Sequence, residues 1–145
     1  MLKFLQKIIL ELVLYNCEAR KYCMGSICGI FNFNNKPADP GLLYRINNIY
    51  PNRGPDRHFE WVDGNVGLGS RILFTTIEST KEQQPASSCD GNYLIVFDGI
   101  LYNRTELISE LINNQIHTDV YTDSEIIVNL YSLYGLKCLN NLNGD

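Results

Sequence analysis

The amino-acid sequence predicts a mixed α+β domain in which strands dominate the first half of the chain and helices the second. Residues 27–33 alternate apolar with small or polar side chains, as a half-buried strand does, and residues 93–98 form a strongly β-type run. Asp63-Gly64 is typical of a hairpin turn. The segment 122–125 has the pattern of a capping box, which marks the start of a helix.

In the first half, the strand at 27–33 is followed by Asp39-Pro40, a capping carboxylate and a proline at the first helical position. This pair predicts a helix over residues 40–50. Residues 51–57 contain two prolines and a glycine, and are therefore expected to form a loop. Two strands should then pair through the turn at Asp63-Gly64, and they cover residues 59–63 and 66–74.

The second half should begin with a polar loop and continue with a second hairpin, in which Gly99 permits the turn. Two helices are expected to follow, the first capped by Asn103 and the second by the capping box and ended by a glycine. The expected elements are a loop over 75–92, a strand over 93–98 paired through Leu101-Tyr102, a helix over 104–113, and a helix from Thr122 to about Tyr134, ended by Gly135.

Length and composition suit one soluble domain, because 145 residues with 45% hydrophobic and 19% charged side chains can build a core. The net charge of −4 and the lack of a basic stripe argue against nucleic acid as a partner. The five cysteines form no CxxC pair, and the two histidines stand alone. We therefore expect a reduced, cytoplasmic protein without a structural metal.

The first fifteen residues are rich in apolar side chains, but Lys3, Lys7 and Glu11 recur every four residues and form one polar stripe on a helix. The stretch is shorter than the about 20 apolar residues that a membrane span needs, so no membrane association is expected. An amphipathic helix or mistranslated upstream sequence is favoured. A signal peptide stays open as an alternative, although Glu11 interrupts its apolar centre.

Three residues stand out for their chemistry: Cys28 before a glycine at a strand start, Arg53 in a rigid loop, and Asp123 in the first turn of a helix. Each also has an ordinary structural interpretation. In that interpretation, Cys28 is a small buried side chain that packs like an apolar one. Arg53 then is a surface arginine paired with Asp56, and Asp123 a partner of the helix dipole.

The order of the motifs is more specific than any one of them. Together they resemble the class II glutamine amidotransferase domain of asparagine synthetases, from about Met24 to the last residue. The resemblance rests on Cys28-Gly29-Ile30-Phe31, Arg53-Gly54-Pro55-Asp56, Gly67-Leu68-Gly69, Gln84-Pro85, the run from Phe97 to Asn103, Asp123-Ser124-Glu125 and Leu142-Asn143-Gly144-Asp145.

The resemblance implies an Ntn-hydrolase fold, an αββα sandwich of two stacked antiparallel sheets. It also implies a domain over residues 24–145 that is incomplete at its C-terminus, with residues 1–23 as an extension outside it. The chemistry implied is hydrolysis of glutamine, in which a cysteine thiolate attacks the side-chain amide and its own α-amine acts as the base. An N-terminal amine titrates near neutral pH and suits that role.

Residue by residue, the resemblance implies that Cys28 is the nucleophile, that Arg53 binds the α-carboxylate of glutamine and that Asp123 binds its α-ammonium group. The backbone N–H of Gly99 would donate to the oxyanion. Asp98 stands where the family usually has an asparagine that supplies the other donor.

The sequence departs from this pattern at two important places. In the chain as given, 27 residues precede Cys28, and even a start at Met24 leaves Gly25, Ser26 and Ile27 ahead of it. A blocked amine is an amide and cannot act as a base. At the second place, an ionised Asp98 only accepts hydrogen bonds, so it repels an oxyanion. Lesser departures are Asn52, Ser70 and Ile100.

Two functions therefore stay open. In the first, the domain hydrolyses glutamine and supplies ammonia to a synthetase domain that binds ATP and Mg²⁺ and forms asparagine or a related amide. In the second, it is a catalytically silent scaffold of a peptide-modifying, lasso-cyclase-like amide ligase. A homodimer is expected for the full-length protein, no cofactor is expected in this chain, and a gene fragment without a role of its own is a third interpretation.

Overall fold

The computed structural model describes residues 25–145. The amphipathic helix expected within the first fifteen residues lies outside the described residues. The elements are β1 (Ser26–Phe31), α2 (Pro40–Asn47), β2 (Arg57–Asp63), β3 (Val66–Ile72), the 3-10 helix η1 (Glu78–Lys81), β4 (Ala86–Ser87), β5 (Leu94–Ile95), α3 (Arg104–Asn113), α4 (Asp123–Tyr134) and the 3-10 helix η2 (Gly135–Asn141).

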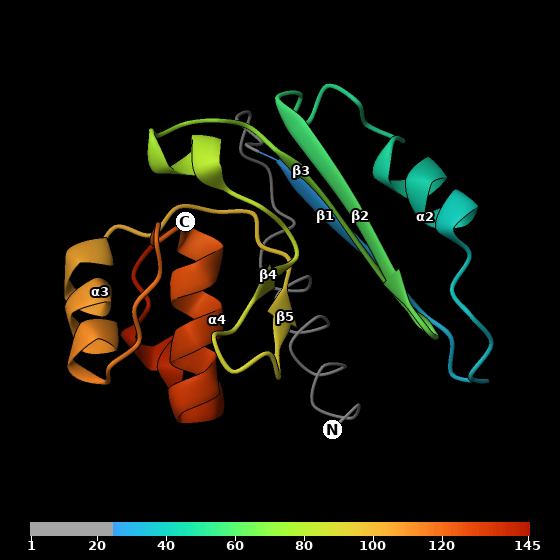
Figure 1. The fold of residues 1–145 in the computed structure, drawn as a ribbon. Coiled ribbons are helices and arrows are strands. Elements are labelled where there is room, and N and C mark those ends of the chain that lie inside the picture. Colours follow the sequence, from blue (N-terminus) through green and yellow to red (C-terminus); the bar gives the residue numbers. More distant parts are fainter. Residues whose placement is uncertain (1–24) are drawn as a thin grey trace.

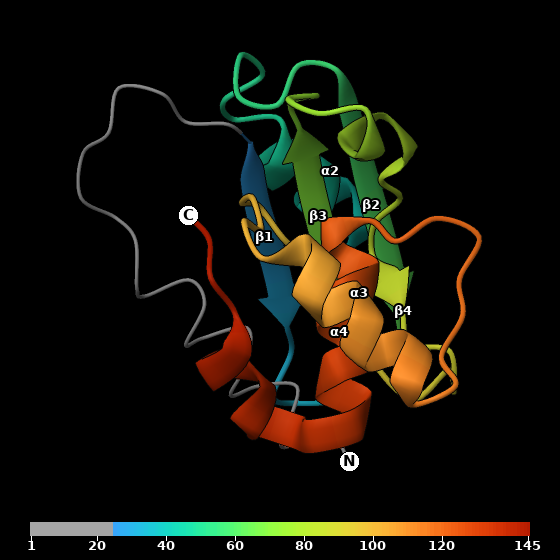
Figure 2. The same ribbon diagram turned by 90° about the vertical axis from the view of Figure 1, so that its left-hand side faces the viewer.

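The elements stack in layers, which Figures 1 and 2 show from two directions. Helix α2 covers one face of a three-stranded antiparallel sheet with the order β1-β3-β2. The two-stranded antiparallel sheet β4-β5 lies on the other side of that sheet, and α4 packs against it, with α3 outermost. The predicted α+β class with antiparallel sheets is thus confirmed.

The first sheet forms around the predicted hairpin. Asp63 pairs with Val66 across the turn, where Gly64 has a φ of 53°, a left-handed conformation that favours glycine. Strand β1 then pairs along the other edge of β3. A Cβ atom at Gly67 would lie 3.2 Å from Leu43 of α2, so the missing side chain is what lets the helix approach the sheet.

The second sheet is smaller than the sequence predicts. Only Leu94–Ile95 of the expected strand 93–98 lie in β5, and β5 pairs with Ala86–Ser87 within the expected loop. The predicted pairing of 93–98 with Leu101 is wrong, because Leu101 instead forms a bridge with Gly144 at the end of the chain. A local sequence pattern does not contain a pairing between residues so far apart.

The helices follow their capping signals. Asp39 accepts a hydrogen bond from the Gly41 N–H at 2.8 Å and Pro40 opens α2, although the helix ends at Asn47 and not at residue 50. A proline at position 51 restricts the residue before it, which favours an early end. The capping box of α4 is present, and Gly135 after it has a φ of 59°.

The predicted cap at Asn103 is wrong: α3 has the expected bounds, but the Asn103 side chain does not bond to it. Its amide instead donates to the Asn141 carbonyl at 2.8 Å and accepts from the Asn143 N–H at 3.0 Å. The side chain therefore ties the helix start to the end of the chain.

The largest apolar cluster lies between the second sheet and the two long helices. Its fully buried members include Leu107 and Leu111 of α3, and Ile126 and Leu130 of α4. Burial of these side chains fixes the position of the α4 N-terminus, where the candidate site begins. Across residues 25–145, no helix has both the length and the apolar character needed to span a membrane.

Candidate functional site

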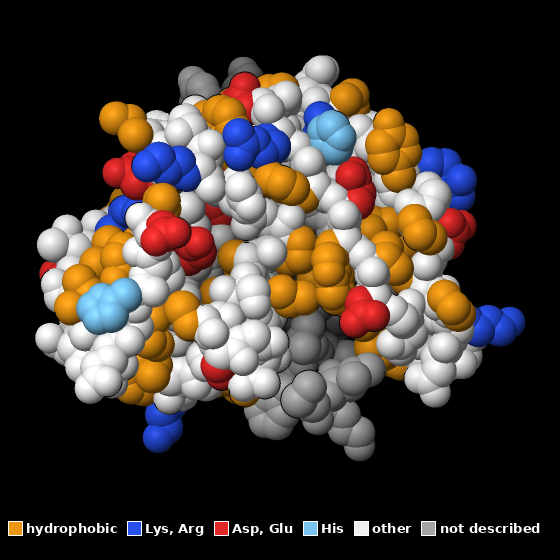
Figure 3. Space-filling view, viewed as in Figure 1, with side chains coloured by type: hydrophobic (Ala, Val, Ile, Leu, Met, Phe, Trp, Pro, Cys, Tyr) orange, Lys and Arg blue, Asp and Glu red, His pale blue; other side chains and the backbone are white. Residues whose placement is uncertain are grey.

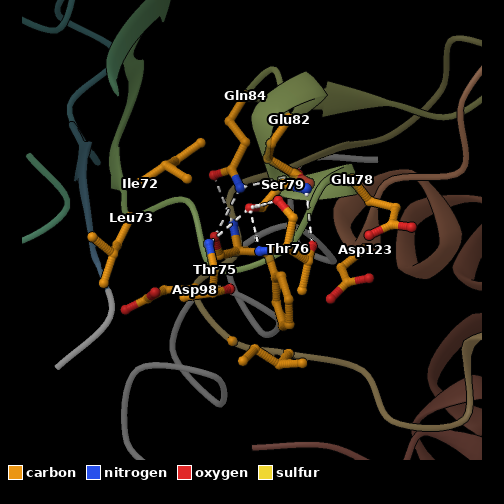
Figure 4. A pocket seen from close by; sticks show the side chains of 13 residues that line it. Ile72, Leu73, Thr75, Thr76, Glu78, Ser79, Glu82, Gln84, Asp98 and Asp123 are labelled. Atoms are coloured by element: carbon orange, nitrogen blue, oxygen red, sulfur yellow. Dashed lines mark hydrogen bonds between the residues drawn. The ribbon is translucent and has the colours of Figure 1, made fainter. Parts of the chain in front are cut away.

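A pocket opens where four segments meet: the end of β3, the turn around η1, the bend after β5 and the start of α4 (Figure 4). Its volume is about 40 Å³, which is room for about three water molecules. Three of the five predicted site residues, Asp98, Gly99 and Asp123, line it. The full lining is Ile72, Leu73, Thr75, Thr76, Glu78, Ser79, Glu82, Gln84, Phe97, Asp98, Gly99, Ile100 and Asp123.

Asp98 faces the start of β1. A Cβ atom at Gly25 would lie 2.7 Å from the Asp98 Oδ1 atom, so only a glycine fits there without movement. Burial raises the pKa of the Asp98 carboxyl above its ordinary value. The backbone N–H of Gly25 and the charge of Arg53 oppose that rise. The carboxyl is therefore in contact with the chain's own backbone.

Asp123 is the first residue of α4 and lies across the pocket from Asp98 (Figure 4). It forms an ion pair with Arg104 and accepts a hydrogen bond from the Leu101 N–H at 2.9 Å. Its position also favours a negative charge, because the N-terminus of a helix carries a partial positive charge. The structure thus gives Asp123 partners in Arg104 and Leu101 in addition to the helix dipole.

Gly99 lies between the two carboxylates in sequence and lines the same pocket. Its backbone N–H has no hydrogen-bond partner within residues 25–145. A donor of this kind can stabilise an anion. A Cβ atom here would lie 2.5 Å from the Asp145 carbonyl oxygen, so the end of the chain requires a glycine at this position.

Arg53 is exposed on its loop, and its charge acts on Asp98. The buried Arg71 holds this loop in place, because its guanidinium donates to the Arg53 and Pro51 carbonyls at 2.8 and 3.0 Å. The alternative interpretation, an ion pair between Arg53 and Asp56, is wrong for the described residues. The Asp56 carboxylate instead accepts a hydrogen bond from the Phe74 N–H at 2.8 Å.

Cys28 lies outside the pocket. It is opposite Gly69 in the sheet, and its Sγ atom lies 3.7 Å from Oδ1 of Asn47 on α2. Burial, and secondarily the charge of Glu60, raise the pKa of its thiol to about 11. Cys28 is therefore a neutral thiol at pH 7, on the α2 face of the sheet.

Gly25, the residue just before β1, contacts Asp98, and Asp98 lines the pocket. Side chains alternate between the two faces of a strand, so positions 25 and 28 point in opposite directions. The structure thus brings Asp98, Gly99 and Asp123 together, with Arg53 nearby, and separates them from Cys28.

Glu82 also lines the pocket, and the sequence analysis does not single it out. It is buried, accepts from the Ser124 hydroxyl, and lies 3.3 Å from the Gln84 side-chain nitrogen. Burial raises the pKa of its carboxyl. No local motif marks it, because its partners come from α4. In the described part of the chain, no group of three or more metal-ligating side chains could hold a metal ion.

The structure is thus an α+β domain with a pocket that Asp98, Gly99 and Asp123 share, with Asp123 at the N-terminus of α4. A family model for the glutamine amidotransferase domain matches residues 24–145, and the chain belongs to this family.

Among known proteins, the chain is similar to asparagine synthetase [glutamine-hydrolyzing] 1 of Bacillus subtilis, with 32% identity over 124 residues, which is 81% of this chain and 20% of the relative. It is 33% identical over 92 residues to asparagine synthetase 2 of that organism, covering 63% of this chain and 12% of the relative. The matching figures for asparagine synthetase 1 of Arabidopsis thaliana are 30%, 92 residues, 63% and 15%. The chain thus spans a fifth or less of these relatives.

Proposed function

We propose that this chain is a catalytically silent glutamine-amidotransferase domain that acts as a scaffold in an asparagine-synthetase-like protein. The observation that carries the proposal is the position of Cys28, whose sulfur faces Asn47 of α2 and not the pocket. A nucleophile has to reach the reacting carbon together with the oxyanion donors. The described residues offer no thiol at the pocket that contains Gly99.

The state of the thiol supports the same conclusion. A cysteine attacks as its thiolate, and a pKa of about 11 leaves only about one molecule in ten thousand ionised at pH 7. A free α-amine at Cys28 would require removal of everything before it. Cleavage there would take away Ser26 and Ile27, which pair with Arg71 and Ser70 and are two of the six residues of β1.

The pocket supports the proposal as well. Asp98 and Asp123 already have partners in Gly25 and in Arg104 and Leu101, so neither needs a ligand to satisfy it. An ionised Asp98 would also oppose a developing oxyanion.

The layer order of helix, sheet, sheet and helix supports an Ntn-hydrolase sandwich as the finer fold. The relatives are named glutamine-hydrolyzing asparagine synthetases, which supports a role beside a synthetase domain. By the family resemblance, that domain would bind ATP and Mg²⁺ and form an amide. In this proposal the domain contributes a folded surface to that protein. No observation favours the peptide-modifying branch over asparagine formation, and the scaffold role holds for either amide acceptor.

The test is a glutaminase assay on the purified chain and on its Cys28→Ala variant, with release of glutamate from L-glutamine as the readout. We expect both proteins to release glutamate at the same background rate. A rate in the unaltered chain that disappears with Cys28→Ala would overturn the proposal. Thermal unfolding of both proteins, with and without L-glutamine, controls for folding and for binding without hydrolysis.

The glutaminase reading has one specific observation in its favour, namely that Asp98, Gly99 and Asp123 share one pocket with Arg53 beside it. It requires Cys28 to be the first residue of the mature protein. Intact-mass spectrometry of the protein from its native host decides this point. A mass that corresponds to a chain beginning at Cys28 would favour hydrolysis. A mass that corresponds to a chain beginning at any earlier residue would leave the cysteine without a base.

A further inference from the structure

Three Asp-Gly pairs occur in the sequence: Asp63-Gly64, Asp90-Gly91 and Asp98-Gly99. The backbone nitrogen after an aspartate can attack the aspartate side-chain carbon, and a glycine leaves that approach open because it has no Cβ atom. Attack requires a nitrogen that is not engaged elsewhere and a backbone that can turn toward the side chain. It also requires a carboxyl that holds its proton, since a carboxylate is a poor electrophile. The structure gives the three pairs different environments.

Asp90-Gly91 has neither a free nitrogen nor a protonated carboxyl. The Gly91 N–H donates to the Ser88 carbonyl at 2.9 Å. The Asp90 carboxylate accepts from the hydroxyls of Ser88 and Ser132, and from both the backbone N–H and the side-chain amide of Asn92. These donors hold the pKa of the Asp90 carboxyl well below its ordinary value. Both reacting groups are therefore held apart.

Asp63-Gly64 is held by the first hairpin. Asp63 is the last residue of β2 and pairs with Val66 of β3. The Gly64 carbonyl accepts from the Ala38 N–H at 2.9 Å. A turn of the backbone toward the Asp63 side chain would disturb this pairing, so the hairpin opposes the attack although the pair is exposed to water.

Asp98-Gly99 lies outside the helices and strands. Among the described residues, neither the Asp98 backbone nor the Gly99 N–H has a hydrogen-bond partner. The residues on both sides are anchored, Phe97 by the Gln84 side chain and Ile100 by a backbone hydrogen bond at 3.0 Å. The peptide group between Asp98 and Gly99 can therefore rotate without loss of a hydrogen bond from this part of the chain.

The Asp98 carboxyl differs from that of Asp90 in the same sense. Burial raises its pKa, so it keeps its proton to a higher pH than an ordinary aspartate, although the Gly25 N–H and the charge of Arg53 oppose the rise. Figure 3 shows acidic and basic side chains interspersed around η1, which contributes to the pocket lining. The other charged side chains that line the pocket are Glu78, Glu82 and Asp123.

From this arrangement we infer that Asp98-Gly99 is a site of spontaneous backbone modification, at which Asp98 closes to a succinimide with the Gly99 nitrogen and reopens as an isoaspartyl residue. The Gly25 N–H faces the Asp98 carboxyl and can donate to the oxygen that becomes negative as the Cγ atom turns tetrahedral. The adjoining pocket has room for water. This inference does not rest on the proposed function.

The reaction needs no oxidant and no partner other than water. A bond forms between the Gly99 nitrogen and the Asp98 Cγ atom, and the nitrogen loses its proton. The carboxyl hydroxyl leaves with that proton as water. Water then reopens the ring. Attack at Cγ restores aspartate, whereas attack at the main-chain carbonyl carbon leaves the chain running through Cγ, with one more carbon in the backbone beside the pocket.

The test is storage of the folded chain at neutral pH, followed by peptide mass spectrometry. A succinimide is lighter than aspartate by one water, and an isoaspartyl peptide has an unchanged mass but elutes separately and gives its own electron-transfer fragments. We expect modification at Asp98 at least about tenfold faster than at Asp90 or Asp63, since one unit of pKa alone changes the protonated fraction about tenfold. Equal rates at the three pairs, or a slower rate at Asp98, would overturn the inference.

The same chain unfolded in guanidinium chloride is the first control. The three pairs have the same two residues, so their rates should converge once the fold no longer distinguishes them. In the folded chain, the rate at Asp98 should also begin to fall at a higher pH than in the unfolded chain, because the folded protein holds the proton more tightly. An advantage of Asp98 that persists in the unfolded chain, or identical pH profiles, would overturn the inference.

The variant Asp98→Glu is the second control. It keeps the carboxyl, but cyclisation would need a six-membered ring, which forms far more slowly, so modification at this position should disappear. A product that persists there would contradict the proposed chemistry. Thermal unfolding checks that the variant is folded, and the comparison of Asp98 with Asp90 within the unaltered chain decides the question if it is not.

Discussion

Cys28 and Gly25 are three positions apart in the sequence but face opposite sides of the first sheet. The half-buried Cys28 sulfur lies beside Asn47 and Gly69, whereas Gly25 contacts Asp98 beside the pocket. Their environments differ accordingly: one holds a neutral thiol, and the other has no space for any side chain. The reactivity of the thiol and the tolerance of the glycine are therefore separate properties that two experiments can measure.

Alkylation with iodoacetamide tests the thiol. Because burial raises the pKa of Cys28 to about 11, its thiolate is scarce at pH 8, and modification should be slow and should accelerate up to about pH 11. Peptide mass spectrometry measures the rate, and the exposed Cys89 in the same sample is the internal comparison. Faster modification of Cys28 than of Cys89 at pH 7 would contradict the geometry described above.

Substitution of Gly25 tests the close packing at the pocket. An added Cβ atom would lie 2.7 Å from the Asp98 carboxylate and would press against the Arg71 carbonyl. We expect Gly25→Ala to reduce the free energy of unfolding by about 1–3 kcal/mol, as overpacking does. Gly29→Ala is the matched control on the same strand, since its Cβ atom would stay 3.4 Å from the nearest atom. Urea titrations that rank the two variants the other way would refute this account.

At the scale of elements, helix α4 connects the apolar cluster with the pocket. Its N-terminus holds Asp123 at the pocket, and the buried Ser124 beside it bonds to Glu82. The cap on this helix is therefore more than a local feature. Loss of the cap should both weaken the helix and loosen two pocket contacts.

Thr122→Ala removes the side chain that accepts from the Glu125 N–H. We expect a loss of about 1 kcal/mol in the free energy of unfolding, a common value for such caps. Thr105→Ala in α3 is the control, because this exposed position lies inside a helix, where alanine is favoured over threonine. The prediction is wrong if thermal unfolding shows no difference between the two variants.

Three helix starts show how element boundaries arise. Asp39 and the capping box of α4 act as their local patterns indicate, because these caps need only residues two or three positions apart. Asn103 has the right residue type and position for a cap, yet its side chain bonds to Asn141 and Asn143. A competing partner from a distant segment decided that case.

At the scale of the whole molecule, the pocket joins the two halves of the chain through buried carboxyls. Glu82 comes from the connection between the sheets, and its hydrogen-bond partner Ser124 comes from α4. Burial raises the pKa of Glu82, and the charge of Glu125 acts in the same direction. The ionised form of this carboxyl is thus unfavourable in the folded protein.

This raised pKa makes a prediction for stability against pH. The folded protein binds the Glu82 proton more tightly than the unfolded chain, so the contribution is complete below the unfolded pKa and is lost as pH rises through the folded pKa. Glu82→Gln keeps the shape without the ionisation. From about pH 4 to pH 8, we expect the variant to lose less free energy of unfolding than the unaltered chain. Parallel pH profiles from urea titrations would rule this out.

Much of the architecture follows from local signals. The hairpin at Asp63-Gly64, the start of α2 at Pro40 and the bounds of α3 are all predictable, because each depends on residues close in sequence. The short β5 and the pairing of Leu101 with Gly144 are not, because they depend on contacts between distant segments. The ordered motifs that resemble a family were sufficient to predict the membership that the family model shows.

By itself, the sequence determined the α+β class, most helix positions and the amidotransferase family, since these depend on local periodicity, caps and the order of motifs. The tertiary structure decided the site. It placed Asp98, Gly99 and Asp123 around one pocket, added Glu82, and turned Cys28 away toward α2. The physical reason is that a strand presents alternate residues to opposite faces, and only the packing of α2 and the second sheet decides which face meets the pocket.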